Sequence, residues 1–89
     1  MRVKEGFVMR EVAGQYVVIA VGEASKTFHG MIKLNRTGKD IWECLQKGLE
    51  EEEIVKTLQE KYQVTIEEVR QDVQEFLSKM KEMEFLADE

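Results

Sequence analysis

The sequence predicts an α+β fold of the winged helix-turn-helix type, with an N-terminal three-stranded antiparallel sheet followed by three helices. Three observations lead to this prediction. The first third of the chain carries runs of β-branched and aromatic residues, which are typical of strands. From residue 35 onward, apolar residues recur at helical spacing. A short link, Gln63-Val64, joins the last two helices. Together, the two helices and the link have the length of a helix-turn-helix motif.

The bulk composition predicts a single domain that spans residues 1–89. The 89 residues include no Pro, and the six Gly are scattered, so no linker divides the chain. No apolar run approaches the ~20 residues that cross a bilayer. The N-terminus lacks an apolar signal region and the chain has one Cys, so we expect a cytoplasmic protein that contacts no membrane.

The first two strands are predicted at residues 7–12 and 16–21, where β-branched and aromatic residues are concentrated. A three-residue loop, Ala13-Gly14-Gln15, would join them, with Gly14 free to adopt a positive φ. Residues 22–26 are predicted to form a loop.

A second, tighter hairpin is predicted around the only His of the chain. Residues 27–28 and 31–32 would pair across a turn at His29-Gly30, because His tolerates a positive φ better than most residues do. A catalytic role for His29 would need a nucleophile or an orienting carboxylate nearby. Cys44 belongs to a different element and is expected to pack at the margin of a helix, so we predict no catalytic residue.

Three helices follow, each with a recognisable start. Asn35 or Thr37 is expected to cap the first helix, which would end at Gly48. The second is expected to begin near Glu50, where the acidic residues 50–53 suit the positive end of the helix dipole.

The third helix has the clearest start signal, a capping box formed by Thr65 and Glu68. Its predicted apolar face consists of Ile66, Val69, Val73, Phe76, Leu77, Met80 and Met83. Phe85 and Leu86 would then pack back onto the core.

Recognisable catalytic and cofactor motifs are missing from the sequence. No Cys/His cluster has metal-ligand spacing, and no Gly-rich loop matches a phosphate cradle, so we expect neither a metal nor a cofactor and no enzymatic activity. The formal net charge of −5 disfavours nucleic acid, because Lys and Arg supply most of the affinity for phosphate. These absences favour a binding module.

The third strand, Met31-Ile32-Lys33-Leu34, alternates in a way that assigns Ile32 and Leu34 to the core and Met31 and Lys33 to the outside. As the last strand of a meander it is an edge strand, and its unpaired backbone groups invite another strand. One interpretation is capture of an extended peptide. The alternatives are an edge covered by the C-terminal segment or by a second copy of the chain in a homodimer.

The ordered set of residues along the chain resembles the PqqD-like family. That family contains the small protein of pyrroloquinoline quinone (PQQ) biosynthesis and the recognition elements of ribosomally synthesised, post-translationally modified peptides (RiPPs). The residues that carry the resemblance are Gly22-Glu23, Phe28, Gly30, Ile32, Leu34-Asn35, Thr37-Gly38, Ile41-Trp42, Asp72-Val73 and Phe76-Leu77. Glu84 departs from the pattern, since a Gly often precedes the final apolar pair in the family.

The resemblance implies a peptide chaperone without catalysis of its own. Members bind the leader segment of a precursor peptide as an added strand beside the third strand and against the third helix. They present it to a modifying enzyme, often a radical S-adenosylmethionine (SAM) enzyme. Carried over by position, the peptide-binding residues would be Met31, Ile32, Lys33 and Leu34 on the strand and Arg70, Val73, Gln74, Leu77 and Lys81 on the helix.

These residues would have different roles. Val73 and Leu77 would line an apolar pocket, and Arg70, Lys33 and Lys81 would attract acidic residues of the leader. The alternative interpretations are core packing for Val73 and Leu77 and ordinary solvated charge for Arg70 and Lys81.

Two other functions compete with leader binding. One is a winged-helix DNA-binding or regulatory protein, although residues 67–72 are acidic where a recognition helix is normally basic. The other is a scaffold that associates with itself through the same strand edge.

Overall fold

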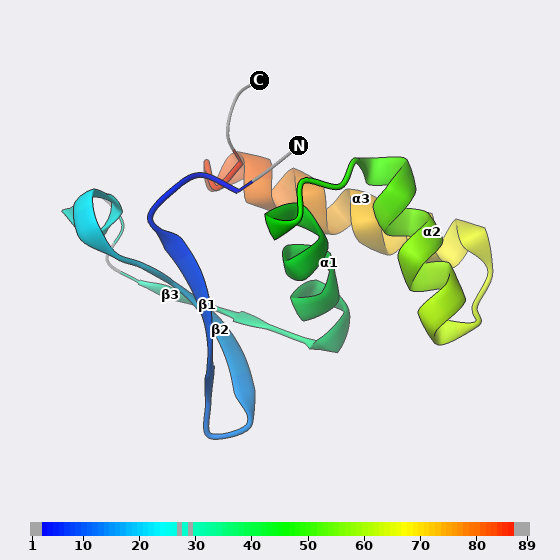
Figure 1. Cartoon of the computed structure of the whole chain (residues 1–89), viewed down its shortest axis with the longest axis horizontal. Helices are drawn as coiled ribbons and strands as arrows, with labels where there is room; N and C mark the ends of the chain where they lie inside the picture. The colour runs from blue at the N-terminus through cyan, green and yellow to red at the C-terminus, as the bar shows by residue number, and fades with distance from the viewer. Residues whose placement is uncertain (1–2, 27, 29, 87–89) are drawn as a thin grey trace.

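The computed structural model describes residues 3–26, 28 and 30–86. The predicted fold class is confirmed: a three-stranded antiparallel sheet precedes three helices, which pack together on one side of it (Figure 1). In chain order the elements are β1 (Phe7–Val12), β2 (Gln15–Ala20), a short 3₁₀ helix η1 (Gly22–Lys26), β3 (Met31–Leu34), α1 (Arg36–Gln46), α2 (Glu51–Tyr62) and α3 (Ile66–Glu82).

The turn between β1 and β2 is one residue shorter than the sequence suggested. Gln15 belongs to β2 and pairs with Val12, so only Ala13 and Gly14 lie between the strands. Both adopt positive φ, 51° and 79°, as a two-residue type I′ turn requires. That turn matches the right-handed twist of the strands, which explains why the chain tolerates the cost of Ala13 in this conformation.

The predicted hairpin at residues 27–32 is not the pairing that forms. β3 pairs with β2, with Ile32 opposite Val18, and the segment between these strands crosses through η1. Phe28 lies in no strand; its amide donates to the carbonyl of Ala24 at 3.0 Å. Its ring packs against the ring of Phe85. Burying the ring there removes apolar surface from water, which favours this position over one in a short exposed strand. Thr27 and His29 lie outside the described residues.

The helices begin at the caps that the sequence suggested. Of the two candidates for α1, Asn35 is the N-cap: its side-chain oxygen accepts from the amide of Gly38 at 2.7 Å. Thr65 caps α3 in the same way, accepting from the amide of Glu68 at 3.3 Å. At the start of α2, the amide of Glu50 donates to the side chain of Glu53 at 2.9 Å.

The core lies mainly among the three helices. Its fully buried large side chains are Trp42, Phe85, Ile41, Leu45, Ile54, Leu58, Met80, Val18, Val55 and Val73. The face predicted for α3 is therefore correct at its centre but too long at both ends. Ile66, the first residue of α3, is 40% exposed, and Met83, its C-cap residue, is 37% exposed.

The C-terminal segment connects the sheet to the helices, as predicted for Phe85 and Leu86. The Phe85 ring lies 4.4 Å from that of Phe7 on β1 and 6.3 Å from that of Trp42 on α1, centroid to centroid. Its carbonyl accepts from the amide of Lys4 at 2.8 Å, and Leu86 pairs with Val3.

The chain leaves α3 through a tight backbone reversal. The amides of Glu84 and Phe85 donate to the carbonyls of Lys81 and Met80 at 3.0 and 2.9 Å, which is a Schellman motif. Glu84 takes its left-handed position with φ of 61°, so a residue with a Cβ stands where glycine is usual.

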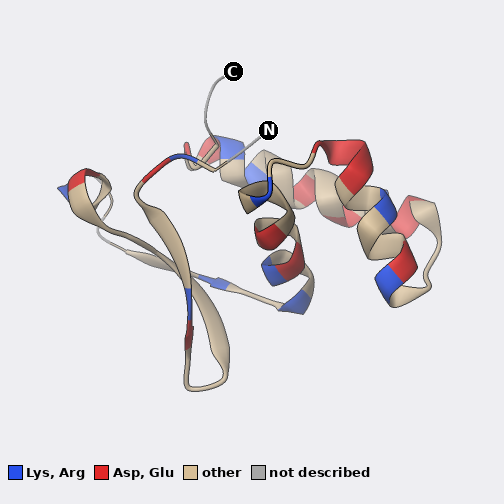
Figure 2. Ribbon diagram, in the orientation of Figure 1, with Lys and Arg blue, Asp and Glu red and all other residues tan. Residues whose placement is uncertain are grey.

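Charged residues are distributed along all three helices, and acidic residues are concentrated at the start of α2 (Figure 2). No helix within the described ranges is long and apolar enough to cross a membrane.

Candidate functional site

The outer edge of β3 carries no neighbouring strand in the part of the chain that the structure describes. The direction in which the N–H and C=O groups of β3 point can be derived from the pairing of β2 with its two neighbours. The amide of Val21 donates to the carbonyl of Gly6 beside β1, at 2.7 Å. Because successive residues of a strand alternate in direction, Tyr16 and Val18 turn their backbone groups toward β3.

The same alternation fixes the outward groups of β3. Leu34 and Ile32 lie opposite Tyr16 and Val18, so their backbone groups are used within the sheet. Met31 and Lys33 therefore point their N–H and C=O groups away from the sheet. These groups form the part of the edge to which a further strand can bind.

Side chains on β3 alternate as predicted. Ile32 and Leu34 are partly buried against the core, whereas Lys33 is exposed and Met31 is 61% exposed. Met31 is thus a large apolar side chain left in solvent at the same edge that lacks a strand partner.

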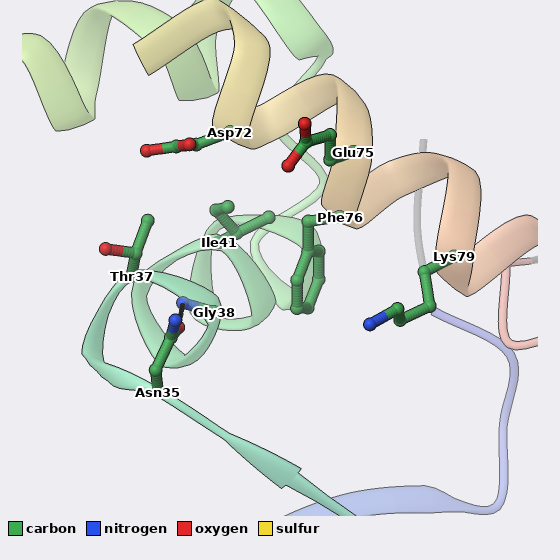
Figure 3. Close-up of a pocket in the computed structure, with 8 residues that line it drawn as sticks. All are labelled: Asn35, Thr37, Gly38, Ile41, Asp72, Glu75, Phe76 and Lys79. Atoms are coloured by element: carbon green, nitrogen blue, oxygen red, sulfur yellow. Dashed lines mark hydrogen bonds between the residues drawn. The ribbon is translucent and has the colours of Figure 1, made fainter. Parts of the chain in front are cut away.

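A pocket of about 350 Å³ lies where β3 passes into α1. One wall is the N-cap and first turns of α1, and the other is one flank of α3 (Figure 3). The lining residues are Asn35, Thr37, Gly38, Ile41, Asp72, Glu75, Phe76 and Lys79. Because Asn35 directly follows Leu34, the pocket lies next to the end of β3.

Phe76 approaches α1 closely because residue 38 is glycine. A Cβ at Gly38 would lie 3.0 Å from Cε2 of Phe76 and 3.2 Å from Oδ1 of Asn35. The absence of that atom lets the partly buried ring pack over the capped turn. Figure 3 shows Phe76 and Ile41 as the apolar part of a pocket whose other lining residues are polar or charged.

None of the five residues predicted on the helix side lines this pocket. Val73 and Leu77 are buried in the core, at 0% and 2% exposed. Arg70 points to α2, where its guanidinium binds both carboxylate oxygens of Glu52, with Nη2 at 3.2 Å from Oε2. Gln74 and Lys81 are exposed on α3. Whether any of them contacts a peptide stays a prediction.

The α3 residues at the pocket were not selected from the sequence. Phe76 did carry a signal, since it lies at the margin of the apolar face. Asp72 and Lys79 carried a weaker signal, as charged residues along one flank of that face. Because both α1 and α2 contact α3, the flank that borders the pocket depends on their packing, which the periodicity of α3 does not specify.

The sequence suggested Asp40 only as a partner of Thr37 at the start of the first helix, and the structure instead shows it as a buried carboxylate bound from α2. It is 6% exposed and accepts hydrogen bonds from Tyr62 Oη and from Lys61 Nζ, the latter at 2.9 Å. Burial would raise the pKa of Asp40, but the hydrogen bonds and the positive charges of Lys61 and Lys39 lower it below its ordinary value. Burial, together with the bond to Asp40, raises the pKa of Tyr62 to about 12. This cluster connects α1 to the end of α2 and does not line the pocket.

The described residues include no grouping of three or more His, Cys, Asp or Glu side chains that would hold a metal. Cys44 is buried, and this burial raises the pKa of its thiol. The thiol is therefore protonated near neutral pH and is a poor nucleophile.

The family model described as "Coenzyme PQQ synthesis protein D (PqqD)" matches residues 8–86. Among curated proteins, none matches the chain significantly.

Two solved structures share the fold over nearly the whole chain. One is "TbiB1 in Complex with the TbiA(beta) Leader Peptide", with a TM-score of 0.77 and 24% identity; the match covers 99% of this chain and 100% of that one. The other is "Lasso peptide synthetase B1 complexed with the leader peptide", with a TM-score of 0.77 and 16% identity, covering 98% and 96%. At these identities, the likeness shows the fold.

Proposed function

Because the chain belongs to the family of coenzyme PQQ synthesis protein D, we propose that it is a peptide chaperone that binds the leader segment of a ribosomally made precursor. The observation that carries this proposal is the free edge of β3 beside a pocket walled by α1 and α3. Both solved structures that share the fold are leader-peptide complexes, which supports the same role.

In the proposed mechanism, the leader adds to the sheet as a fourth strand. The outward N–H and C=O groups of Met31 and Lys33 form the ladder, and Ile32 and Leu34 hold β3 against the core. Phe76 and Ile41 offer an apolar contact to a leader side chain.

The predicted helix-side residues have more limited roles in this mechanism. Val73 and Leu77 act by holding α3 in place, since both are buried. Gln74 and Lys81 flank the site on α3 as predicted peptide contacts. The ion pair between Arg70 and Glu52 on α2 leaves the Arg70 guanidinium less able to bind the leader.

The protein then presents the leader to a modifying enzyme, which we expect to be a radical SAM enzyme. In this proposal the chain itself carries out no chemical step. Its contribution is to raise the local concentration of the precursor peptide near the modifying enzyme.

Affinity capture from an extract of the source cells tests the proposal. The bait is the tagged protein, and the two edges of the sheet offer a matched pair of variants. Lys33→Pro removes an outward amide on β3. Glu11→Pro removes the equivalent amide on β1, because Glu11 lies opposite Tyr16, whose backbone groups point to β3. Proline is tolerated at both places, since neither amide is used within the sheet.

We expect wild type and Glu11→Pro to retain a short peptide together with a large modifying enzyme, and Lys33→Pro to lose the peptide. Circular dichroism would confirm that both variants are folded. Retention of the peptide by folded Lys33→Pro would contradict strand addition at β3. Recovery of only untagged copies of the bait would favour self-association through this edge.

A further inference from the structure

The flank of α3 that borders the pocket carries opposite charges at its two ends. Asp72 and Glu75 are carboxylates and Lys79 is an ammonium group. Asp72 and Lys79 are seven residues apart, or about 10 Å along the helix axis. Figure 3 shows Asp72 close to Thr37 on α1, whereas Lys79 lies on the side from which β3 approaches.

These charges are largely available to a ligand. Within the described residues, the side chains of Asp72 and Lys79 have no hydrogen bond or ion pair, and the carboxylate of Glu75 accepts only a long bond, 3.3 Å, from Gln71 on its own helix. A ligand in the pocket would therefore meet side chains that no neighbouring element neutralises.

Arg36 and Lys39, the cations near the start of α1, do not line the pocket with the two carboxylates. Lys39 is bound by Glu43 at 3.0 Å and lies over the ring of Tyr16, away from the pocket. The N-terminus of α1 contributes about half a positive charge, part of which the cap of Asn35 already offsets. Apart from Lys79 at the other end, the charged side chains that line the pocket are the carboxylates of Asp72 and Glu75.

The direction of an added strand follows from the sheet. All strand pairs are antiparallel, and β3 runs from Met31 toward α1. A peptide that continues this antiparallel pattern would place its N-terminal part beside Asp72 and its C-terminal part beside Lys79. Its residues would alternate between the face of α3 and the outer face, where Lys33 is exposed.

We propose that the groove formed by the edge of β3 and the pocket selects peptides by the order of their charges. The preferred order is a basic residue first, an apolar residue over Phe76, and then an acidic residue. This inference rests on the proposed function, since it assumes strand addition at β3. The selected class is an extended peptide whose Lys or Arg precedes its Asp or Glu on the face turned to α3.

A displayed library of random peptides, selected on the immobilised protein and then sequenced, tests this order. The key variant combines Asp72→Lys with Lys79→Glu, which inverts the two ends at constant net charge. The matched control combines Glu60→Lys with Lys56→Glu, the same exchange on the exposed surface of α2. Lys33→Pro serves as the variant with a blocked edge.

On wild type and on the control, peptides with the basic residue first should be enriched about fivefold over the reverse order, as expected for one favourable surface ion pair. The inverted variant should prefer the reverse order. If peptides are enriched without charge order, or if the inverted variant keeps the wild-type order, the inference is wrong. Strand addition still stands in that case, provided that Lys33→Pro loses the peptides. If wild type enriches nothing beyond Lys33→Pro, the proposed function fails, and the charge order fails with it.

Discussion

The helical half and the sheet half of the molecule contribute differently to its stability. Of the ten large side chains that are fully buried, Val18 alone comes from a strand, whereas eight come from helices and Phe85 follows α3. The helices are also connected by the Asp40 cluster, while the tip of the β1–β2 hairpin leaves Val12 57% exposed. The difference teaches that most of the core comes from the helices, whereas the sheet contributes the free backbone edge at which we propose that a peptide binds.

Replacing Phe85 should have the largest effect on the stability of the protein, because its ring contacts both halves. We expect Phe85→Ala to lower the free energy of unfolding by about 3–5 kcal/mol, through lost burial and a residual cavity. Val12→Ala, at the exposed tip of the sheet, should change it by less than about 0.5 kcal/mol. Urea denaturation measures both, and similar losses in the two variants would contradict the division between the halves.

Removing one hydrogen bond inside the helical half should have an intermediate effect. Tyr62→Phe leaves the buried carboxylate of Asp40 short of a donor, so we expect a loss of about 1–3 kcal/mol in the free energy of unfolding. Thr57→Ala, on the exposed side of α2, is the control, with an expected change within about 0.5 kcal/mol.

The pH dependence of stability provides a second measurement on the same pair. The pKa of Asp40 is lower in the folded protein than its ordinary value of 3.8, so its contribution is complete above that value. The contribution is lost as the pH falls below 3.8 and through the lower pKa of the folded protein. Tyr62→Phe should show a smaller acid-induced loss, and an equal loss would show that the hydrogen bond does not lower the pKa.

The smallest expected effect is a gain, at the left-handed residue after α3. Glu84→Gly should raise the free energy of unfolding by about 1 kcal/mol, because glycine adopts φ of 61° without a Cβ penalty. Glu84→Ala removes the carboxylate but keeps the Cβ, so its stability should stay near that of wild type. Thermal denaturation distinguishes the two variants. If Glu84→Gly and Glu84→Ala were equally stabilised, the gain would come from the loss of the carboxylate charge and not from the loss of the Cβ.

Local features of the sequence predicted most of the fold. The alternation along β3 is a two-residue period, so it correctly assigned Ile32 and Leu34 to the core. The caps at Asn35 and Thr65 depend on hydrogen bonds that span three residues, which sequence reasoning can recognise. Phe28 was assigned wrongly because its position depends on Phe85, a residue distant in the sequence.

The peptide-binding residues predicted from the sequence stay a prediction, and those on the helix side differ from the residues that line the pocket. The apolar period of α3 identifies a buried face but does not reveal which flank meets α1, so Asp72 and Phe76 were not selected for the groove. The burial of Asp40 was missed for the same reason, since its hydrogen-bond partners Lys61 and Tyr62 are 21 and 22 residues away. Such contacts arise from packing between helices and leave little local trace in the sequence.

The pairing of Val3 with Leu86 has a consequence for protein engineering. It brings the first and last described segments of the chain together, so a short linker can join them in a circular permutant with new ends in the exposed turn at Ala13-Gly14. For the same reason, the domain can be inserted into a surface loop of another protein without separating the two sides of that loop. The fold can therefore serve as a unit that carries the free edge of β3, the proposed binding site, into a larger host protein.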